Sequence, residues 1–519
     1  MTEEPKRRAR GGGRAGAKIR RGSAIIEQMP WNPPVNIDRP VEPLGPEGVE
    51  AIHHGAMRIL EEIGIEIYNT QAVEIFREAG CTINGENVRM GRDMVMEYVA
   101  MAPSEFTITP RNPDRKITIG GKNMVFGNVS SPPNYWDMST GGKVVGTRAR
   151  CQDLIKLTQY FNCIHFAGGY PVEPQDIHAS VRHLDVLYDK LTLTDKAMHA
   201  YSLGKERVED VMEMVRISQG LSHEEFEETP RMYTNINSTS PLKHDIPMLD
   251  GWIRLAKRNQ GLVVTPFTLA GAMAPVTMAG AVAQSLAEAL IAVVLAQIVR
   301  PGASVAIGTF TSNVDMKTGA PAFGTPEYMR ATQMTGQLCR FYGLPMRSSG
   351  VCAANVPDGQ AMWETSNSLW AAVQSGTNMV YHAAGWLEGG LIASPEKFIM
   401  DCEILQQIQR YMEPQICATG PDEIAFDAIK EVGHGSHFFG IQHTQDRYTT
   451  AFYQPFLSDW TNFEGWEVAG GIWTQERAHH LFKEIVGAFE PPPMDVARRD
   501  ELAAFVERRK AEGGAPTDF

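Results

Sequence analysis

Paired cysteines are missing from this sequence. Its 519 residues hold seven cysteines, and no two of them stand in a CxxC or CxxxC spacing: Cys81, Cys151, Cys163, Cys339, Cys352, Cys402 and Cys417. Zinc ribbons and iron–sulfur sites take their ligands from such pairs, and disulfide scaffolds crowd cysteines into a short chain. The sequence therefore predicts no bound metal and no disulfide framework.

Several enzyme signatures are also missing. The sequence has no GxGxxG after an apolar run, no GxxxxGK[ST], no HExxH and no GxSxG. The DxHxxG motif typical of a corrinoid-binding domain begins at Asp176 and His178 but fails at Val181, where the pattern needs glycine. We therefore expect that the chain holds no corrinoid of its own.

No apolar run is long enough to cross a membrane without interruption. The nearest approach, residues 276–299, carries Gln284, Glu288 and Gln297 at helical spacing. This pattern predicts a buried helix packed on the wall of the protein, and no membrane partner. No apolar signal peptide stands at the amino end, so we expect a cytoplasmic protein.

Positive charge is scarce outside the amino end. The net charge is −13, yet residues 1–22 carry eight Lys or Arg against two Glu, which leaves 40 basic and 59 acidic residues, a net of −19, in the remainder. Such an acidic body argues against nucleic acid as the main ligand. Residues 1–40 are expected to form a disordered basic head and a proline-rich arm. The head is interpreted as a solvated tail, with contact to nucleic acid or an acidic partner as the alternative.

The sequence does contain an eightfold repeat. A short apolar run, a polar or glycine-rich break and an amphipathic helical stretch recur, with the apolar runs at residues 164–170, 191–199, 231–239, 262–269, 304–311, 345–354, 378–386 and 438–444. Strands that alternate with helices pair in parallel through right-handed crossovers. Eight such units predict an α/β fold, a (β/α)8 TIM barrel over residues 151–490.

Residues 41–150 lie outside this repeat. Helical and strand patterns alternate there irregularly, which predicts an N-terminal α+β layer: helices over 48–64, 70–80 and 93–101, and strands over 88–90, 106–109 and 117–119. Residues 491–519 are expected to form a C-terminal tail with a short charged helix.

The seventh predicted strand carries the most informative side chains. Catalytic residues of TIM barrels lie at the carboxyl ends of the strands. The run NMVYHAAGW, residues 378–386, puts Val380, His382, Ala384 and Trp386 on one face by strand alternation. If that face is the lumen, an imidazole and an indole lie together at the mouth. The alternatives are a hydrogen-bonded core histidine and a tryptophan used for packing.

Two other strand ends are candidates for binding. The run CAANVPDGQ, residues 352–360, has small side chains that leave room for a ligand or another molecule's prosthetic group, although larger neighbours could fill that space. Asp358 is expected to cap the following helix. Asn235 and Asn237 share one face of the third strand, which suits either a polar lumen wall or a substrate clamp.

Short motifs along the body carry a family resemblance. They are ILEEIG at 59–64, APSEFTITPR at 102–111, LAGAMAPVTMAG at 269–280, VPDGQA at 356–361 and YHAAGW at 381–386. In their order and spacing the sequence resembles the trimethylamine methyltransferase (MttB) family, in the branch without pyrrolysine. The resemblance covers almost the whole body, from about residue 48 to residue 488.

This resemblance implies a TIM-barrel enzyme that moves a methyl group from a methylated amine to the Co(I) of a corrinoid carried by a separate protein. Members that use trimethylamine have pyrrolysine on the sixth strand. The matching position here falls at or within a few residues of Asn355, an ordinary residue. The resemblance therefore implies a quaternary amine as the methyl donor, with glycine betaine as the leading candidate.

The same resemblance suggests which residues hold such a donor. Aromatic faces bind a quaternary ammonium, each contributing about 1–2 kcal/mol when desolvated, and the available ones are Trp386, Tyr170, Phe267, Phe310 and Trp363. A carboxylate on the donor needs hydrogen-bond donors, for which the candidates are His382, Asn235, Asn237 and Gln360. His382 is expected to hold or polarise the substrate near the methyl group, without transferring a proton.

Two other functions remain open at this level. One is a barrel enzyme that acts on a small methylated amine without a corrinoid, and the other is a non-catalytic sensor of quaternary amines. The corrinoid-independent enzyme requires paired acid and base groups of shifted pKa in a closed pocket. The proline-rich arm and the apolar helices also suggest a homo-oligomer.

Overall fold

The chain folds around a ring of eight parallel strands. The computed structural model describes residues 25–201 and 203–517, so the basic head at 1–22 lies outside the described residues. The strands run in the order β10-β9-β6-β19-β18-β15-β13-β11. A parallel bridge between His199 and Tyr233 joins the two ends of this sheet, and the Ala200 N–H donates to the Tyr233 carbonyl at 2.7 Å. The predicted TIM barrel is confirmed.

The barrel strands are short and almost wholly buried. They are β6 (Val125–Asn128), β9 (Phe166–Ala167), β10 (Ala197–Met198), β11 (Tyr233–Ile236), β13 (Gly261–Val264), β15 (Val305–Gly308), β18 (Met346–Ser349) and β19 (Met379–Ala384). Seven of them fall in or at the edge of predicted apolar runs.

The repeat was predicted one unit out of register. The first barrel strand is β6, which lies before residue 151, in the segment predicted to stand outside the barrel. A hairpin, β7 (Asn134–Asp137) and β8 (Gly142–Val145), separates β6 from its helix and hides the unit. The predicted eighth strand over 438–444 is wrong, because that run forms η5 (Phe438–Gly440) and α15 (Gln442–Gln445). Its apolar side chains do not enter a core, so nothing favours pairing in a sheet.

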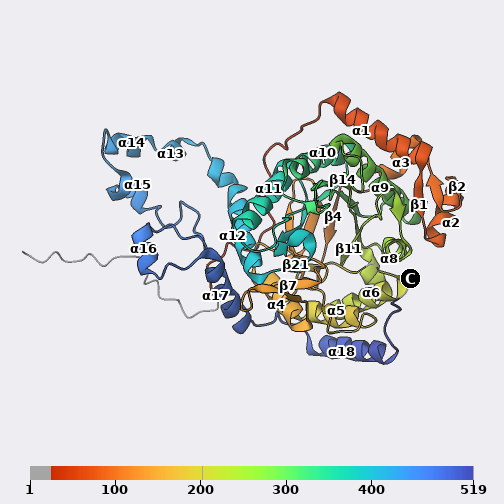
Figure 1. Cartoon of the computed structure of the whole chain (residues 1–519). Helices are drawn as coiled ribbons and strands as arrows, with labels where there is room; N and C mark the ends of the chain where they lie inside the picture. The colour runs from red at the N-terminus through yellow and green to blue at the C-terminus, as the bar shows by residue number, and fades with distance from the viewer. Residues whose placement is uncertain (1–24, 202, 518–519) are drawn as a thin grey trace, which may run out of the picture.

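One long helix follows each barrel strand and covers the outside of the ring (Figure 1). These helices are α4 (Arg148–Tyr160), α5 (Arg182–Leu193), α6 (Lys205–Gln219), α8 (Ile246–Lys257), α9 (Met278–Val299), α10 (Pro326–Tyr342), α11 (Gly359–Ser375) and α12 (Pro395–Tyr411). Short polar side chains begin several of them, and Asp358 accepts the backbone N–H of Ala361 as the expected cap of α11. A further short helix, α7 (His223–Glu228), follows α6.

The N-terminal layer lies against α9. It consists of α1 (Pro46–Arg58), the π-helical turn η1 (Ile59–Ile63), β1 (Ile65–Ile67), α2 (Thr70–Glu78), β2 (Thr82–Asn84), β3 (Asn87–Arg89) and α3 (Arg92–Val99), with β12 (Lys243–His244) added to its sheet. By length and composition α9 could cross a membrane, yet 89% of its most apolar stretch is buried. The layer covers the outer face of α9 (Figure 1), which explains its all-round apolarity and confirms the predicted buried helix.

A second hairpin fills the amino end of the barrel. It is formed by β4 (Glu105–Ile108) and β5 (Ile117–Gly120), followed closely by β6, with η2 (Pro113–Arg115) at its tip. Phe106, Ile108, Ile117 and Ile119 share one buried cluster with lumen side chains such as Tyr233. Because this end is packed, a ligand can enter the barrel only from the carboxyl ends of the strands.

Small sheets and turns form the rim at the carboxyl ends. One sheet has the order β20-β21-β7-β8, and another has the order β14-β16-β17. The additional elements are β14 (Leu269–Ala270), β16 (Ser312–Val314), β17 (Pro321–Ala322), β20 (Trp386–Leu387), η3 (Glu388–Gly390) and β21 (Ile392–Ala393).

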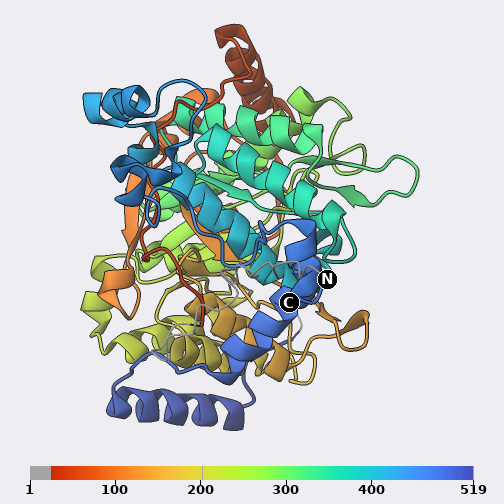
Figure 2. The same ribbon diagram turned by 90° about the vertical axis from the view of Figure 1, so that its left-hand side faces the viewer.

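Residues 413–473, called the projecting segment below, leave the barrel after α12 (Figures 1 and 2). Besides η5 and α15 it contains only short elements: η4 (Pro414–Cys417), α13 (Pro421–Ile424), α14 (Phe426–Val432) and α16 (Phe463–Val468). The chain then returns as α17 (Thr474–Gly487), which packs on α12 and α4, and ends in α18 (Val496–Ala511) beside α5 and α6. The last helix, α18, agrees with the charged helix that the sequence predicts for the tail.

Candidate functional site

A cavity of about 300 Å3 opens at the carboxyl ends of the barrel strands. Seven of the eight barrel strands, or the segments that follow them, supply all of the lining residues except Met248, which lies on α8. The lining residues are Ser130, Ser131, His199, Tyr201, Leu203, Asn235, Asn237, Met248, Phe267, Phe310, Arg347, Tyr381, His382, Trp386, Gly389 and Gly390. This is the end at which TIM barrels place their active sites. The exposed Ser131 marks the side that faces solvent.

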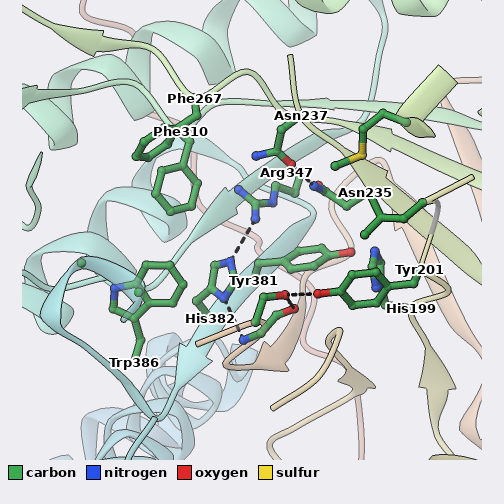
Figure 3. Close-up of a pocket in the computed structure, with 16 residues that line it drawn as sticks. His199, Tyr201, Asn235, Asn237, Phe267, Phe310, Arg347, Tyr381, His382 and Trp386 are labelled. Atoms are coloured by element: carbon green, nitrogen blue, oxygen red, sulfur yellow. Dashed lines mark hydrogen bonds between the residues drawn. The ribbon is translucent and has the colours of Figure 1, made fainter. Parts of the chain in front are cut away.

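One wall of the cavity is aromatic (Figure 3). The ring centroids of Phe267 and Phe310 lie 5.2 Å apart, and Phe310 lies 6.0 Å from Trp386. The imidazole of His382 lies 4.2 Å from the Trp386 ring and 6.0 Å from Phe310. Trp386 is held by its Nε1, which donates to the Cys352 carbonyl at 3.2 Å, and by the Cys352 thiol, which donates to the Trp386 carbonyl at 3.0 Å.

The opposite wall is polar (Figure 3). Thr265 Oγ1 donates to Asn235 Oδ1, and Asn235 Nδ2 donates to Asn237 Oδ1, both at 2.9 Å. The hydroxyl groups of Ser131 and Tyr201 lie 2.8 Å apart. These bonds fix the amide planes along the wall and leave the Asn237 amide nitrogen available to a ligand.

Arg347 lies between the two walls and carries the only charge among the described residues that line the cavity. Only 2% of this residue is exposed. Burial lowers the pKa of its guanidinium to about 10, so the group stays protonated at neutral pH. Its Cζ lies 4.4 Å from the centre of the Tyr381 ring and 5.4 Å from that of Phe310. Its Nε and Nη1 atoms have no hydrogen-bond partner.

His382 reaches the cavity through an irregularity in β19. Its φ of +52° is in the left-handed region, and the register of β19 against β6 shifts between Val380 and Ala384. Non-glycine residues in this region store strain that is concentrated at functional sites. Burial and the Arg347 charge lower the pKa of His382 well below its usual value, so the ring is neutral.

The strand alternation predicted for β19 is only partly correct. Met379 and Tyr381 belong to the buried cluster inside the barrel, whereas Val380 packs in the cluster outside it. The regular alternation would therefore place His382 outside, away from the lumen. The shifted register and positive φ turn its side chain back, so that Tyr381 and His382 both line the cavity.

Six of the residues singled out from the sequence line this cavity: His382, Trp386, Asn235, Asn237, Phe267 and Phe310. Tyr170 lies just behind the wall, with its ring stacked on Tyr201 at 4.3 Å. Asn355 is exposed in the loop after β18, and Gln360 is exposed in the first turn of α11, where it donates to Glu364 at 2.9 Å. The structure does not bring these two residues, or the exposed Trp363, into the cavity.

The sequence reasoning missed Arg347, Tyr381, His199 and Tyr201. The signal for Arg347 was available, because it is a lone charge in the middle of a barrel strand, MRSS, in which every residue is buried. Burial lowers the pKa of His199 to about 3, so this ring is neutral as well. In the described part of the chain, no group of three or more His, Cys, Asp or Glu side chains could hold a metal ion.

Comparisons with known proteins show the family of this chain. The model of the trimethylamine methyltransferase (MTTB) family matches residues 10–514. A glycine betaine methyltransferase of Desulfitobacterium hafniense (strain Y51) is 36% identical over 467 residues, which cover 90% of this chain and 96% of that protein. The trimethylamine methyltransferase MttB of Methanosarcina barkeri is 28% identical over 474 residues, covering 89% of this chain and 93% of that protein.

A solved structure shares the fold. The monomethylamine methyltransferase MtmB of Methanosarcina barkeri superposes with a TM-score of 0.53 at 11% sequence identity, covering 89% of this chain and 88% of that one. The family match spans nearly the whole sequence. The chain belongs to the trimethylamine methyltransferase (MTTB) family.

Proposed function

We propose that this protein transfers a methyl group from a quaternary amine resembling glycine betaine to the Co(I) of a corrinoid carried by a separate protein. Its relatives are methyltransferases for glycine betaine and for trimethylamine, which supports methyl transfer from a methylated amine. The observation that supports a quaternary amine as the methyl donor is the aromatic wall of Phe267, Phe310 and Trp386 beside the neutral His382.

The chemistry of a quaternary donor suits this wall. One N–CH3 bond breaks, the nitrogen keeps the electron pair and leaves as a neutral tertiary amine, and the new carbon–cobalt bond takes its pair from Co(I), which becomes Co(III). No proton is transferred, and the described lining contains no carboxylate that could act as acid or base. The protein contributes by orienting one methyl group towards the mouth and by excluding water.

Trp386 and the ring face of His382 are proposed to hold the ammonium end of the donor. Aromatic faces attract a desolvated cation by about 1–2 kcal/mol each, and Phe310 and Phe267 extend the same wall. A neutral imidazole adds no repulsive charge next to the methyl groups. Asn355 and Gln360 are left out of this proposal because both are exposed away from the cavity.

The rim of the mouth supports a protein partner that presents the methyl acceptor. Val276, Met316 and Leu391 lie on loops around the carboxyl ends of the strands and are 71%, 72% and 49% exposed. Such unpaired apolar side chains around a site favour association with another protein surface. We propose that a corrinoid protein docks here and delivers its cobalt above the cavity.

A direct assay tests this function. The protein is mixed with chemically reduced Co(I) cobalamin and one methylated amine at a time, and methyl-Co(III) is followed by absorbance. We expect methylation from glycine betaine and its loss in His382→Ala. Amine binding without methylation, even after addition of a dedicated corrinoid protein, would favour a sensor, and amine turnover without Co(I) would favour a corrinoid-independent enzyme.

We further propose that the protein forms a homo-oligomer through the projecting segment. Its α-helices have 4–7 residues, far fewer than the ~12–15 that an isolated helix needs. Twelve large apolar side chains on it are exposed, among them Phe439 and Phe452 at 79% and 76%. If each buries on the order of 100 Å2, a reciprocal contact between two copies buries roughly 2,000 Å2, which is typical of obligate dimers.

A cytoplasmic location is proposed as well. The six cysteines whose side chains are described are all free thiols, which suits a reducing compartment. The apolar helix α9 is packed inside the protein.

A further inference from the structure

We infer that Arg347 is the anchor for a carboxylate on the methyl donor, so that the site selects zwitterionic amines over purely cationic ones. This inference rests on the proposed function and adds a residue and a substrate class to it. Of the residues that the sequence suggests for this carboxylate, His382 remains, and Arg347 is added to it.

The charge balance of the cavity is the first argument. Arg347 is protonated and buried, and no Asp or Glu is found among the described residues that line the cavity. Besides burial, the groups that act on the pKa of Arg347 are Tyr381, Tyr328 and Tyr233, which are phenols rather than carboxylates. A buried charge without a counter-ion is costly, and the cost falls when a ligand supplies the opposite charge.

The hydrogen-bond donors give the second argument. Two donors point at the neutral His382 ring: the Ser130 N–H at 3.2 Å from Nδ1 and the Arg347 Nη2 at 3.4 Å from Nε2. A neutral imidazole accepts at only one nitrogen. The backbone donor is fixed and closer, so Nδ1 accepts from Ser130 and Nε2 carries the ring proton. This proton then faces the guanidinium, and both donors lack an acceptor.

A carboxylate oxygen satisfies both donors at once. It would accept from His382 Nε2–H and from an unpartnered N–H of Arg347, whose Nε and Nη1 make no hydrogen bond. The Tyr381 ring holds the guanidinium plane from one side at 4.4 Å. Guanidinium groups bind carboxylates through paired, charge-assisted hydrogen bonds, which are about twice as strong as neutral ones.

The distance between the guanidinium of Arg347 and the Trp386 ring limits the length of the methyl donor. Phe310 touches both, since its ring centre lies 5.4 Å from the guanidinium carbon and 6.0 Å from the Trp386 ring. The carboxylate and the ammonium therefore bind within about one ring of each other, which suits a spacer of one or two carbons. A betaine with a long chain would have to fold back to use both walls.

Cationic amines without a carboxylate should bind poorly, because they cannot pair with the positive charge of Arg347. Choline has the same trimethylammonium group but brings no anion, so it leaves Arg347 unpaired and adds a second positive charge. Sites built to pair with a polar substrate group reject analogues that lack it by roughly 100-fold or more. We expect at least that difference between glycine betaine and choline.

Calorimetric titration of the whole protein tests this inference. Wild-type protein is titrated with glycine betaine and with choline, and the same two amines are then tested as methyl donors to Co(I) cobalamin. We expect glycine betaine to bind at least 100-fold more tightly. Arg347→Met should lose most of that preference by weakening glycine betaine alone, and Arg347→Lys should retain part of it. Arg300→Met, a substitution at the end of α9 on the other side of the barrel, is the matched control.

The outcomes separate the inference from the proposed function. Equal binding and equal methyl transfer for choline and glycine betaine in the wild-type protein would overturn the inference and leave methyl transfer intact. Selective, Arg347-dependent binding of glycine betaine without methyl transfer would support the inference and remove the proposed function. The wild-type comparison decides the matter even if Arg347→Met does not fold.

Discussion

At the scale of single residues, His382 illustrates how the site is built against local preference. Its side chain is 8% exposed and its backbone is left-handed. Both features cost stability, since a strained backbone costs on the order of 1–3 kcal/mol and burial excludes the charged form of the ring. The gain is a neutral N–H donor beside Arg347 and an aromatic face beside Trp386.

Two substitutions separate strain from function at this position. Alanine and glycine both remove the imidazole that positions the donor, and because a misplacement of about 1 Å costs roughly 100-fold, both variants should lose at least ~100-fold in methyl transfer. Glycine also relieves the left-handed backbone, so His382→Gly should be about 1 kcal/mol more stable to urea than His382→Ala. Equal stability of the two variants would show that the positive φ stores no strain.

The buried histidines predict a loss of stability in mild acid. Burial lowers the pKa of His165 and of His199 to about 3, whereas an exposed histidine has a pKa near 6.5. The unfolded chain therefore binds more protons below pH 6.5, and stability falls as the pH drops from 6.5 towards 3. Each of these histidines lowers the free energy of unfolding by about 1.4 kcal/mol for every pH unit of that drop. Urea unfolding at pH 7 and pH 5 measures this loss, and His199→Gln should show a smaller loss than wild type. The same pH dependence of stability in His199→Gln and in the wild-type protein would contradict the assignment of a neutral, buried His199 ring.

At the scale of elements, β19 and the turn after it position the reactive side chains. The Gly385 N–H in this turn donates to Asp401 Oδ2 on α12 at 2.9 Å. Lys397 pairs with the same carboxylate and also donates to Thr365. Both members of this ion pair are fully buried, so the helix behind the strand fixes the turn that leads to Trp386.

Breaking this pair should be more harmful than removing it. Asp401→Asn leaves the Lys397 charge buried without a partner, which typically costs about 3–5 kcal/mol. The double variant Lys397→Met/Asp401→Asn removes the charge and keeps the amide oxygen as an acceptor for Gly385, so it should recover most of that loss. Urea unfolding of the single and double variants provides the measurement. A double variant as unstable as the single one would show that the unpaired Lys397 charge is not the cause of the lost stability.

The elements also show what sequence periodicity can and cannot predict. Seven of the eight predicted strand–helix units belong to the barrel, because apolar runs followed by amphipathic stretches are compatible with few other folds. Periodicity failed at β6, where a hairpin interrupts the unit, and at 438–444, where an apolar run stays outside the core. It also could not predict the bulge in β19, because a local backbone rotation leaves no trace in the pattern of side chains. Arg347 needed the structure to show that its charge is unpaired.

At the scale of the whole molecule, the projecting segment is the feature that a single chain does not explain. It is attached through Glu403 of α12, which accepts the Tyr453 hydroxyl and the backbone N–H groups of Phe456 and Leu457 at 3.0–3.1 Å. Beyond this attachment most of its aromatic side chains are exposed. A second copy of the chain is the occupant proposed above.

Light scattering during size-exclusion chromatography tests that proposal. The wild-type protein should elute with a mass of at least two chains. Phe439→Ser/Phe452→Ser removes two of the most exposed aromatic side chains of the segment, and it should dissociate the oligomer or weaken it at least ~10-fold. Met316→Ser, at an exposed site on the barrel rim, is the control. A monomeric wild-type protein, or an oligomer indifferent to the double substitution, would contradict self-association through this segment.

The central claim is methyl transfer from a quaternary amine held at His382 and Trp386, and one measurement tests it most directly. Purified protein is added to Co(I) cobalamin and glycine betaine, and the appearance of methyl-Co(III) is followed by absorbance, with His382→Ala in parallel. We predict methylation by the wild-type protein and at least a ~100-fold slower rate in the variant, which loses the positioning of the donor. Absence of methylation with glycine betaine and every other methylated amine, also in the presence of a dedicated corrinoid protein, would contradict the claim.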